Sequence, residues 1–115
     1  MIFCTQSPDY FLPTSACILQ DKLGLNTNIG AVDVNQGCSG FVYSLGLAKG
    51  LIESKQCENV LIITSETYSK FINPKDKSVR TLFGDGACAI LVSTQDCNET
   101  GIFPVIHGTD GSGYA

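Results

Sequence analysis

Basic residues and long apolar runs are scarce in this sequence. Its 115 residues include seven Lys and Arg against eleven Asp and Glu, which gives a formal net charge of −4. Because no Lys/Arg-rich tract is present, binding to nucleic acid or to acidic membrane surfaces is not expected. No apolar run approaches the roughly 18 residues of a membrane span. Met1–Gln6 lacks a basic region followed by a long apolar region, so we expect no signal peptide and a cytoplasmic location.

Metal-binding and disulfide patterns are also missing. With one histidine and no C-x-x-C pair, a zinc site is not supported. Six cysteines could form three disulfides, but most of them lie in or beside periodic apolar segments and not in the loops of a core-poor mini-protein. We therefore expect reduced thiols. Five of the six are interpreted as packing or surface residues: Cys4, Cys17, Cys57, Cys88 and Cys97.

The sequence does contain the pattern of an α/β protein. Hydrophobic residues make up 43% of it, which predicts a buried core. Apolar periodicity and turn residues predict strands at 1–6, 31–34, 60–65, 87–93 and 101–106, and helices at 13–23 and 38–54. The continuous apolar run Val60–Ser65, rich in β-branched residues, is typical of a central strand covered on both faces. This order predicts a mixed β-sheet layered with helices.

Glycines punctuate this pattern. Gly40, Gly46 and Gly50 lie in or near the second predicted helix, where each costs roughly 1 kcal/mol against alanine. Because a missing Cβ permits close approach, we expect another part of the protein to pack tightly on that side. Gly84-Asp85-Gly86 lacks the spacing of a phosphate loop and predicts a tight turn. The connection 68–80, which holds four of the seven basic residues, is a solvated loop or a contact for a phosphorylated carrier.

Cys38 lies at the junction between the second predicted strand and the second predicted helix. Unpaired backbone N–H groups and the helix dipole favour a thiolate there, and Gly37 and Gly40 leave room for a carbonyl substrate. Such a thiolate could attack a thioester and form an acyl-enzyme, with nearby N–H groups as part of an oxyanion hole. The alternative is that Cys38 is a small buried hydrophobic residue. His107 is the only local candidate base, but a lone histidine is more often structural, and nothing in the sequence brings it to Cys38.

Six segments, in their order and spacing, resemble β-ketoacyl-acyl-carrier-protein synthase III, a condensing enzyme of the thiolase-like superfamily. The resemblance covers essentially the whole chain, and the segment after the central strands, His107-x-x-Asp110-Gly111, is also similar to the family. The six segments are Thr5-Gln6-Ser7-Pro8-Asp9, Leu12-Pro13, Asp33-Val34, Gly37-Cys38-Ser39-Gly40-Phe41, Ser65-Glu66 and Leu82-Phe83-Gly84-Asp85-Gly86-Ala87.

The resemblance implies a role for each matching residue. Cys38 matches the nucleophile that takes an acyl group from acyl-CoA, and its N–H would contribute to the oxyanion hole. Leu12 matches an apolar residue inserted into the acyl pocket of the partner subunit. Lys77 stands where the family often has an arginine against the CoA adenine, so the charge is kept and planar stacking is lost. Three residues match positions that line the acyl pocket: Gln6, Tyr68 and Phe83.

The resemblance also implies the wider function. The expected reaction is condensation of the acyl group on Cys38 with malonyl-acyl-carrier protein in fatty acid biosynthesis. The expected partners are acyl carrier protein, acyl-CoA and a second copy in a homodimer, with no cofactor and no metal. His107 does not match the family's catalytic histidine. The catalytic His and Asn belong to a second half that the chain does not contain.

Residues 1–115 are therefore expected to be most of the N-terminal half of a thiolase-like fold, without its first strands and its C-terminal half. We expect that such a piece by itself would not catalyse the full condensation reaction. Two alternatives remain: a related condensing enzyme of secondary metabolism or of the hydroxymethylglutaryl-CoA synthase type, and a non-catalytic assembly fragment.

Overall fold

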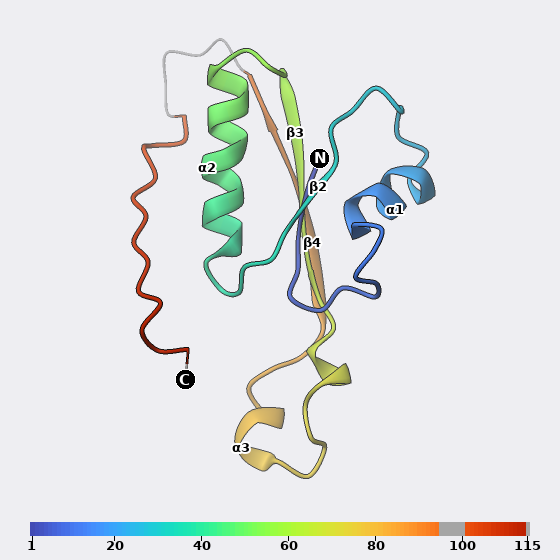
Figure 1. Ribbon diagram of the computed structural model, residues 1–115, viewed down its shortest axis with the longest axis vertical. Coiled ribbons are helices and arrows are strands. Elements are labelled where there is room, and N and C mark those ends of the chain that lie inside the picture. Colours follow the sequence, from blue (N-terminus) through green and yellow to red (C-terminus); the bar gives the residue numbers. More distant parts are fainter. Residues whose placement is uncertain (95–100, 115) are drawn as a thin grey trace.

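The computed structural model describes residues 1–94 and 101–114. The described residues form four strands, three α-helices and one short 3₁₀ helix, shown in Figure 1. In chain order they are β1 (Ile2–Cys4), α1 (Ser15–Lys22), β2 (Val32–Val34), α2 (Gly40–Glu53), β3 (Asn59–Glu66), η1 (Tyr68–Lys70), α3 (Lys77–Arg80) and β4 (Gly86–Ser93).

The four strands form one mixed sheet in the order β2-β1-β3-β4. β1 runs parallel to both of its neighbours, with Ile2 opposite Val32 on one side and Ile62 on the other. β4 is antiparallel to β3 along its whole length, from Asn59 opposite Ser93 to Glu66 opposite Gly86. The mixed sheet predicted from the sequence is confirmed, as is the central place of the strand at 60–65.

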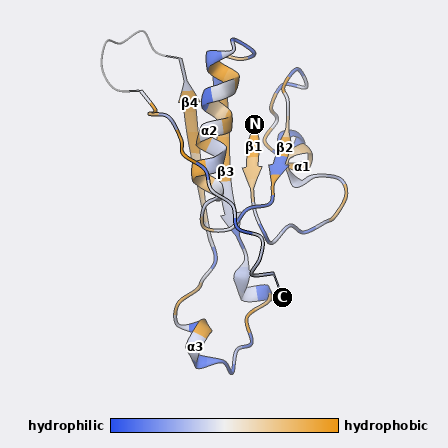
Figure 2. Ribbon diagram, turned by 60° about the vertical axis from the view of Figure 1, so that its left-hand side comes forward, coloured by the Kyte–Doolittle hydropathy of each residue, from blue (hydrophilic) through white to orange (hydrophobic). Residues whose placement is uncertain are grey.

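Helices lie on both faces of the sheet. α2 covers one face and α1 the other (Figure 1). The core under α2 consists of Ile2, Ala48, Val60 and Ile62, all at most 3% exposed. Figure 2 shows hydrophobic residues on β1, β4 and α2, while β2 carries more polar colour. The sheet therefore has an apolar interior under α2. No described helix is long and apolar enough to cross a bilayer.

Local interactions set the ends of α1. The backbone N–H groups of Ser15 and Ala16 both donate to the carboxylate of Asp33, at 2.7 Å each. A carboxylate at this end of a helix satisfies free N–H groups and complements the helix dipole. At the other end Gly24 has a φ of 62°, in the left-handed region where glycine is favoured, and it stops the helix as predicted.

One predicted strand is wrong, and one predicted helix begins later than expected. Residues 101–106 form no strand; the segment 101–114 runs beside α2, on the side away from the sheet (Figure 1). Val105 and His107 lie 3.5 Å from the position that a Cβ on Gly46 would take. Val105 thus lies against a helix and not in the sheet, while Phe103 and Ile106 are exposed. The second helix starts at Gly40 and not at Cys38, because residues 37–40 form a turn first.

Candidate active site

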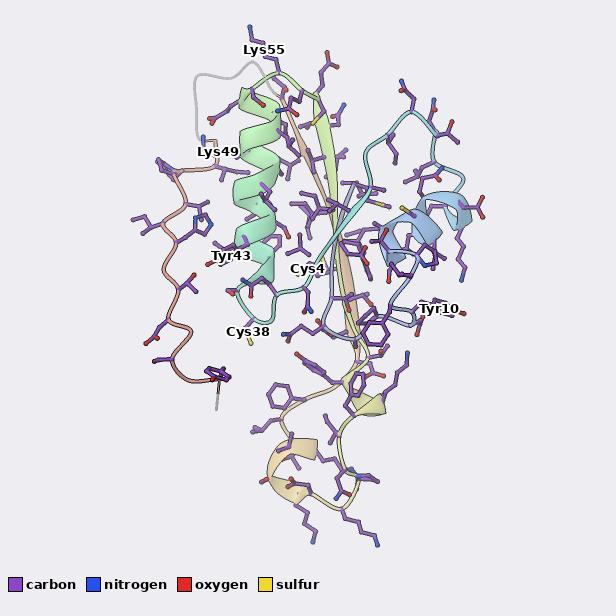
Figure 3. The ribbon with its side chains drawn as sticks, in the orientation of Figure 1. Cys4, Tyr10, Cys38, Tyr43, Lys49 and Lys55 are labelled. Carbon is purple, nitrogen blue, oxygen red and sulfur yellow. The ribbon has the colours of Figure 1, made fainter. Side chains whose placement is uncertain are left out.

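Cys38 lies in the turn that joins β2 to α2. The turn is closed by the N–H of Gly40, which donates to the carbonyl of Gly37 at 2.8 Å, and the helix continues with Tyr43 N–H donating to Ser39 at 3.1 Å. The thiol of Cys38 is exposed, just before the first turn of α2 (Figure 3). The interpretation of Cys38 as a buried packing residue is therefore wrong for this structure.

Two glycines beside Cys38 allow the turn to lie close to β1. A Cβ on Gly37 would stand 2.9 Å from Oε1 of Gln6, and a Cβ on Gly40 would overlap Sγ of Cys4. Real Cβ atoms essentially never approach other atoms so closely. The expected close packing around the glycines of this helix is confirmed at Gly40, is an ordinary contact at Gly46, and is absent at Gly50 among the described residues.

Cys38 opens into a cavity of about 450 Å³. The cavity lies where the carboxyl ends of the parallel strands β1, β2 and β3 meet, which is the edge where α/β proteins commonly bind ligands. It is lined by Cys4, Gln36, Gly37, Cys38, Phe41, Thr64, Ser65, Glu66, Tyr68, Leu82, Phe83, Gly84 and Gly86.

The structure brings three of the predicted site residues to this cavity. Tyr68 and Phe83 line it together with Cys38, and their rings meet edge to face with centroids 5.8 Å apart. Gln6 does not line it, but its Oε1 accepts a hydrogen bond from the Tyr68 hydroxyl at 2.7 Å. Gln6 therefore contributes to the cavity wall indirectly, through its hydrogen bond with Tyr68.

Two predicted site residues lie elsewhere. Leu12 is 83% exposed in the loop before α1 and does not line the cavity. Tyr10 and Phe11 beside it are also exposed, so this loop presents an apolar surface. Lys77 is the first residue of α3, is exposed, and does not line the cavity either.

Glu66 and Cys4 are cavity residues whose position the sequence did not indicate. Glu66 accepts the N–H of Gln6 at 2.8 Å and the hydroxyl of Ser7 at 2.7 Å. Cys4 is 4% exposed, and burial raises the pKa of its thiol. Desolvation, followed by the negative charges of Glu66 and Cys38, raises the pKa of Tyr68. Two signals in the sequence involved Glu66: it follows a predicted strand whose end converges with others at one edge, and Ser65-Glu66 is one of the six segments that resemble the family.

His107 lies away from the cavity lining. Its ring packs against Tyr43, with centroids 4.4 Å apart and planes tilted by 45°. Figure 3 shows Tyr43 on the side of α2 that faces residues 101–114. His107 thus contacts the outer side of α2, in agreement with a structural role and not with that of a base for Cys38.

The described residues contain neither a metal-binding cluster nor a disulfide. No group of three His, Cys, Asp or Glu among them could hold a metal ion. Five cysteines in the described part of the chain, Cys4, Cys17, Cys38, Cys57 and Cys88, are free. Cys97, interpreted above as a packing or surface residue, lies outside the described residues.

Comparisons with known proteins show the family to which the chain belongs. The family 3-Oxoacyl-[acyl-carrier-protein (ACP)] synthase III matches residues 32–111. The beta-ketoacyl-[acyl-carrier-protein] synthase III of Sulfurovum sp. (strain NBC37-1) is 46% identical over 114 residues, which are 97% of this chain and 33% of that protein. The chain thus spans about a third of the length of the curated relatives it matches.

Two solved structures extend the comparison. A crystal structure of a 3-oxoacyl-(acyl-carrier-protein) synthase III has 58% sequence identity and a TM-score of 0.92, over 96% of this chain and 33% of that one. The priming β-ketosynthase of the R1128 polyketide pathway has 33% identity and a TM-score of 0.88, over 97% of this chain and 33% of that one. The likeness confirms the thiolase-like fold expected from the sequence. The chain belongs to the 3-oxoacyl-[acyl-carrier-protein] synthase III family.

Proposed function

We propose that the polypeptide containing this chain is an acyltransferase of the β-ketoacyl-acyl-carrier-protein synthase III type, acting in fatty acid biosynthesis. Cys38 takes an acyl group from acyl-CoA and passes it to malonyl-acyl-carrier protein. One observation carries the proposal: in a chain of this family, an exposed cysteine stands in a tight turn at the mouth of a cavity at the carboxyl edge of the parallel strands.

The first step is transfer of the acyl group to the protein. The Cys38 thiolate attacks the thioester carbonyl, the bond between carbonyl carbon and CoA sulfur breaks, and CoA leaves as its thiol after taking a proton. None of the hydrogen bonds among the described residues uses the backbone N–H of Cys38, so this group is available to stabilise the oxyanion. The aromatic wall of Tyr68 and Phe83 would lie along the acyl chain.

The second step is condensation. Malonyl-carrier protein loses CO₂, the resulting carbanion attacks the carbonyl of the acyl-cysteine, and the Cys38 thiolate is released as the leaving group. The family's His and Asn for this step are not among the 115 residues, so we propose that the chain alone does not complete it. Exposed Leu12 would enter the partner subunit's pocket in a homodimer, and Lys77 would contact the CoA adenine.

The test is acylation and condensation by the longest polypeptide that contains residues 1–115. Acetyl-CoA should leave one acetyl group on Cys38, detected by mass spectrometry of the peptides, and Cys38→Ala should abolish product from malonyl-carrier protein. Cys17→Ala is the matched control, because Cys17 is also exposed but lies in α1. Condensation by Cys38→Ala at the unaltered rate would overturn the proposal.

A condensing enzyme of secondary metabolism is the second candidate, favoured by the likeness to the R1128 priming enzyme. The same assay separates the two when the acyl-CoA donor and the carrier protein are varied and the products are identified. If Cys38 reacts with iodoacetamide no faster than in the unfolded protein, a non-catalytic role is favoured instead.

A further inference from the structure

Glu66 holds the loop that follows β1. Both of its carboxylate oxygens are used: Oε1 accepts the N–H of Gln6 at 2.8 Å, and Oε2 accepts the hydroxyl of Ser7 at 2.7 Å. Hydrogen bonds to an ionised carboxylate are roughly twice as strong as neutral ones. A side chain at the end of β3 thus fixes a loop that lies sixty residues earlier in the sequence.

The same contacts fix the start of η1. The hydroxyl of Ser7 accepts the N–H of Thr67 at 2.8 Å, so one hydroxyl joins the loop after β1 to the residue before Tyr68. On the other side of Tyr68, the N–H and hydroxyl of Ser69 donate to Asp85 at 2.8 Å and 2.5 Å. The backbone around Tyr68 is therefore held from both directions.

The Tyr68 ring is held as well. Its hydroxyl donates to Oε1 of Gln6, and the Tyr68 and Phe83 rings meet edge to face. The Gln6 oxygen also lies against Gly37, next to Cys38. A continuous chain of contacts therefore leads from Glu66 through Gln6 to the Tyr68 ring, which forms one wall of the cavity at Cys38.

We propose that Glu66 is a positioning residue: it fixes Gln6, and through Gln6 the Tyr68 ring, so that this ring limits the width of the cavity beside Cys38. This inference rests on the proposed function for the identity of the acyl donor. The role assigned to Glu66 is to position its neighbours, because both of its carboxylate oxygens already accept from Gln6 and Ser7. Its effect is on the width of the cavity, because a Tyr68 ring without its hydrogen bond is free to turn away from Gln6.

The test compares the size of the groups that Cys38 accepts. In the longest polypeptide containing the chain, the rate of Cys38 acylation by hexanoyl-CoA is divided by the rate with acetyl-CoA. This ratio should rise roughly five-fold in Tyr68→Phe, which removes one hydrogen bond and keeps the ring. Glu66→Ala, which removes both oxygens that accept from Gln6 and Ser7, should raise it by a similar factor. The ratio does not depend on how much of each variant is folded, since both donors meet the same protein.

The double variant and a control decide between positioning and a general loss of structure. Because both substitutions act on the same ring, Tyr68→Phe with Glu66→Ala should raise the ratio no further than either alone. Glu58→Ala makes the same change near the other end of β3, at an exposed side chain, and should leave the ratio unaltered. An unchanged ratio in Glu66→Ala, or a double effect equal to the product of the single ones, would overturn the inference.

A second measurement keeps this inference separate from the proposed function. The alkylation rates of Cys38 by N-hexyl iodoacetamide and by iodoacetamide give the same size ratio without any acyl transfer. If acyl-CoA does not react with Cys38, the proposed function fails, and the alkylation ratio still tests the position of Tyr68. If acylation occurs and neither ratio responds to Glu66→Ala, only the positioning role fails.

Discussion

The two ends of α2 surround their glycines very differently. At the first turn, a Cβ on Gly40 would overlap the Cys4 sulfur and stand 3.1 Å from the Gln36 side chain, whereas a Cβ on Gly50 would meet nothing within 4 Å. Both glycines carry the same intrinsic cost in a helix. The glycines of this helix therefore do not all serve close packing. The tight packing is concentrated at the end that follows Cys38.

Of the substitutions that test this contrast between the two ends of α2, Gly40→Ala should change the free energy of unfolding most. The added methyl group meets a buried thiol with little room to move, and overpacking of this kind typically costs about 1 to 3 kcal/mol. Urea unfolding followed by far-ultraviolet circular dichroism measures the loss. An unchanged unfolding midpoint would mean that the first turn of α2 is less tightly packed than the structure indicates.

The cause of that loss can be checked by making room. Cys4→Ala removes the sulfur that a Cβ on Gly40 would overlap. The double variant should therefore lose less stability than the sum of the losses measured for the two single variants. The recovery should be incomplete, because the Gln36 contact remains.

Gly50→Ala should have a smaller effect of the opposite sign. The added methyl group meets open space, and alanine loses less backbone entropy than glycine, so the free energy of unfolding should rise by about 0.5 to 1 kcal/mol. The same urea titration detects the rise. A loss of stability would show that Gly50 is in contact with another part of the protein and would remove the contrast between the two ends.

The smallest effect should be a pH dependence confined to the tightly packed end. Burial raises the pKa of Cys4 above its ordinary value of 9.0. A group with a raised folded-state pKa contributes its stabilisation in full below the unfolded pKa, and this is lost as the pH rises through the folded value. The wild-type protein should therefore lose stability relative to Cys4→Ala when the pH rises above about 9. Parallel curves for the two proteins up to about pH 10.5 would contradict this expectation.

The sequence predicted most of the secondary structure, but it missed the short helices η1 and α3 within the connection 68–80 and predicted one strand that does not form. The strands at 60–65 and 87–93, both main helices and the stop at Gly24 follow from local periodicity and turn residues. The strand predicted at 101–106 does not form, because the apolar pattern of a segment does not determine which strand or helix it contacts. Val105 and His107 pack against Gly46 of α2.

Local pattern predicted Cys38, and the resemblance to a known family predicted two further cavity residues, Tyr68 and Phe83. Cys38 was found because a strand, a glycine turn and a helix follow one another directly in the sequence. Glu66 was not assigned a role, because its two hydrogen bonds reach Gln6 and Ser7 about sixty positions away, and no local pattern records them. The sequence also placed Gln6 in the cavity lining. In the structure Gln6 lies outside the lining and accepts a hydrogen bond from the Tyr68 hydroxyl.

The strand order has a consequence for the moment at which the sheet forms. β1 leaves the ribosome first among these strands, yet it has one neighbour in β2 and the other in β3, where Ile2 pairs with Ile62. Such non-local parallel pairing is slow, because the intervening chain must be closed into a loop before the contacts form. By contrast, β3 and β4 are joined by the shortest strand connection among the described residues and by the longest ladder. During synthesis β1 therefore cannot complete its pairing until β3 has emerged. The cavity beside Cys38 likewise forms only after Glu66, which lines it, has been synthesised.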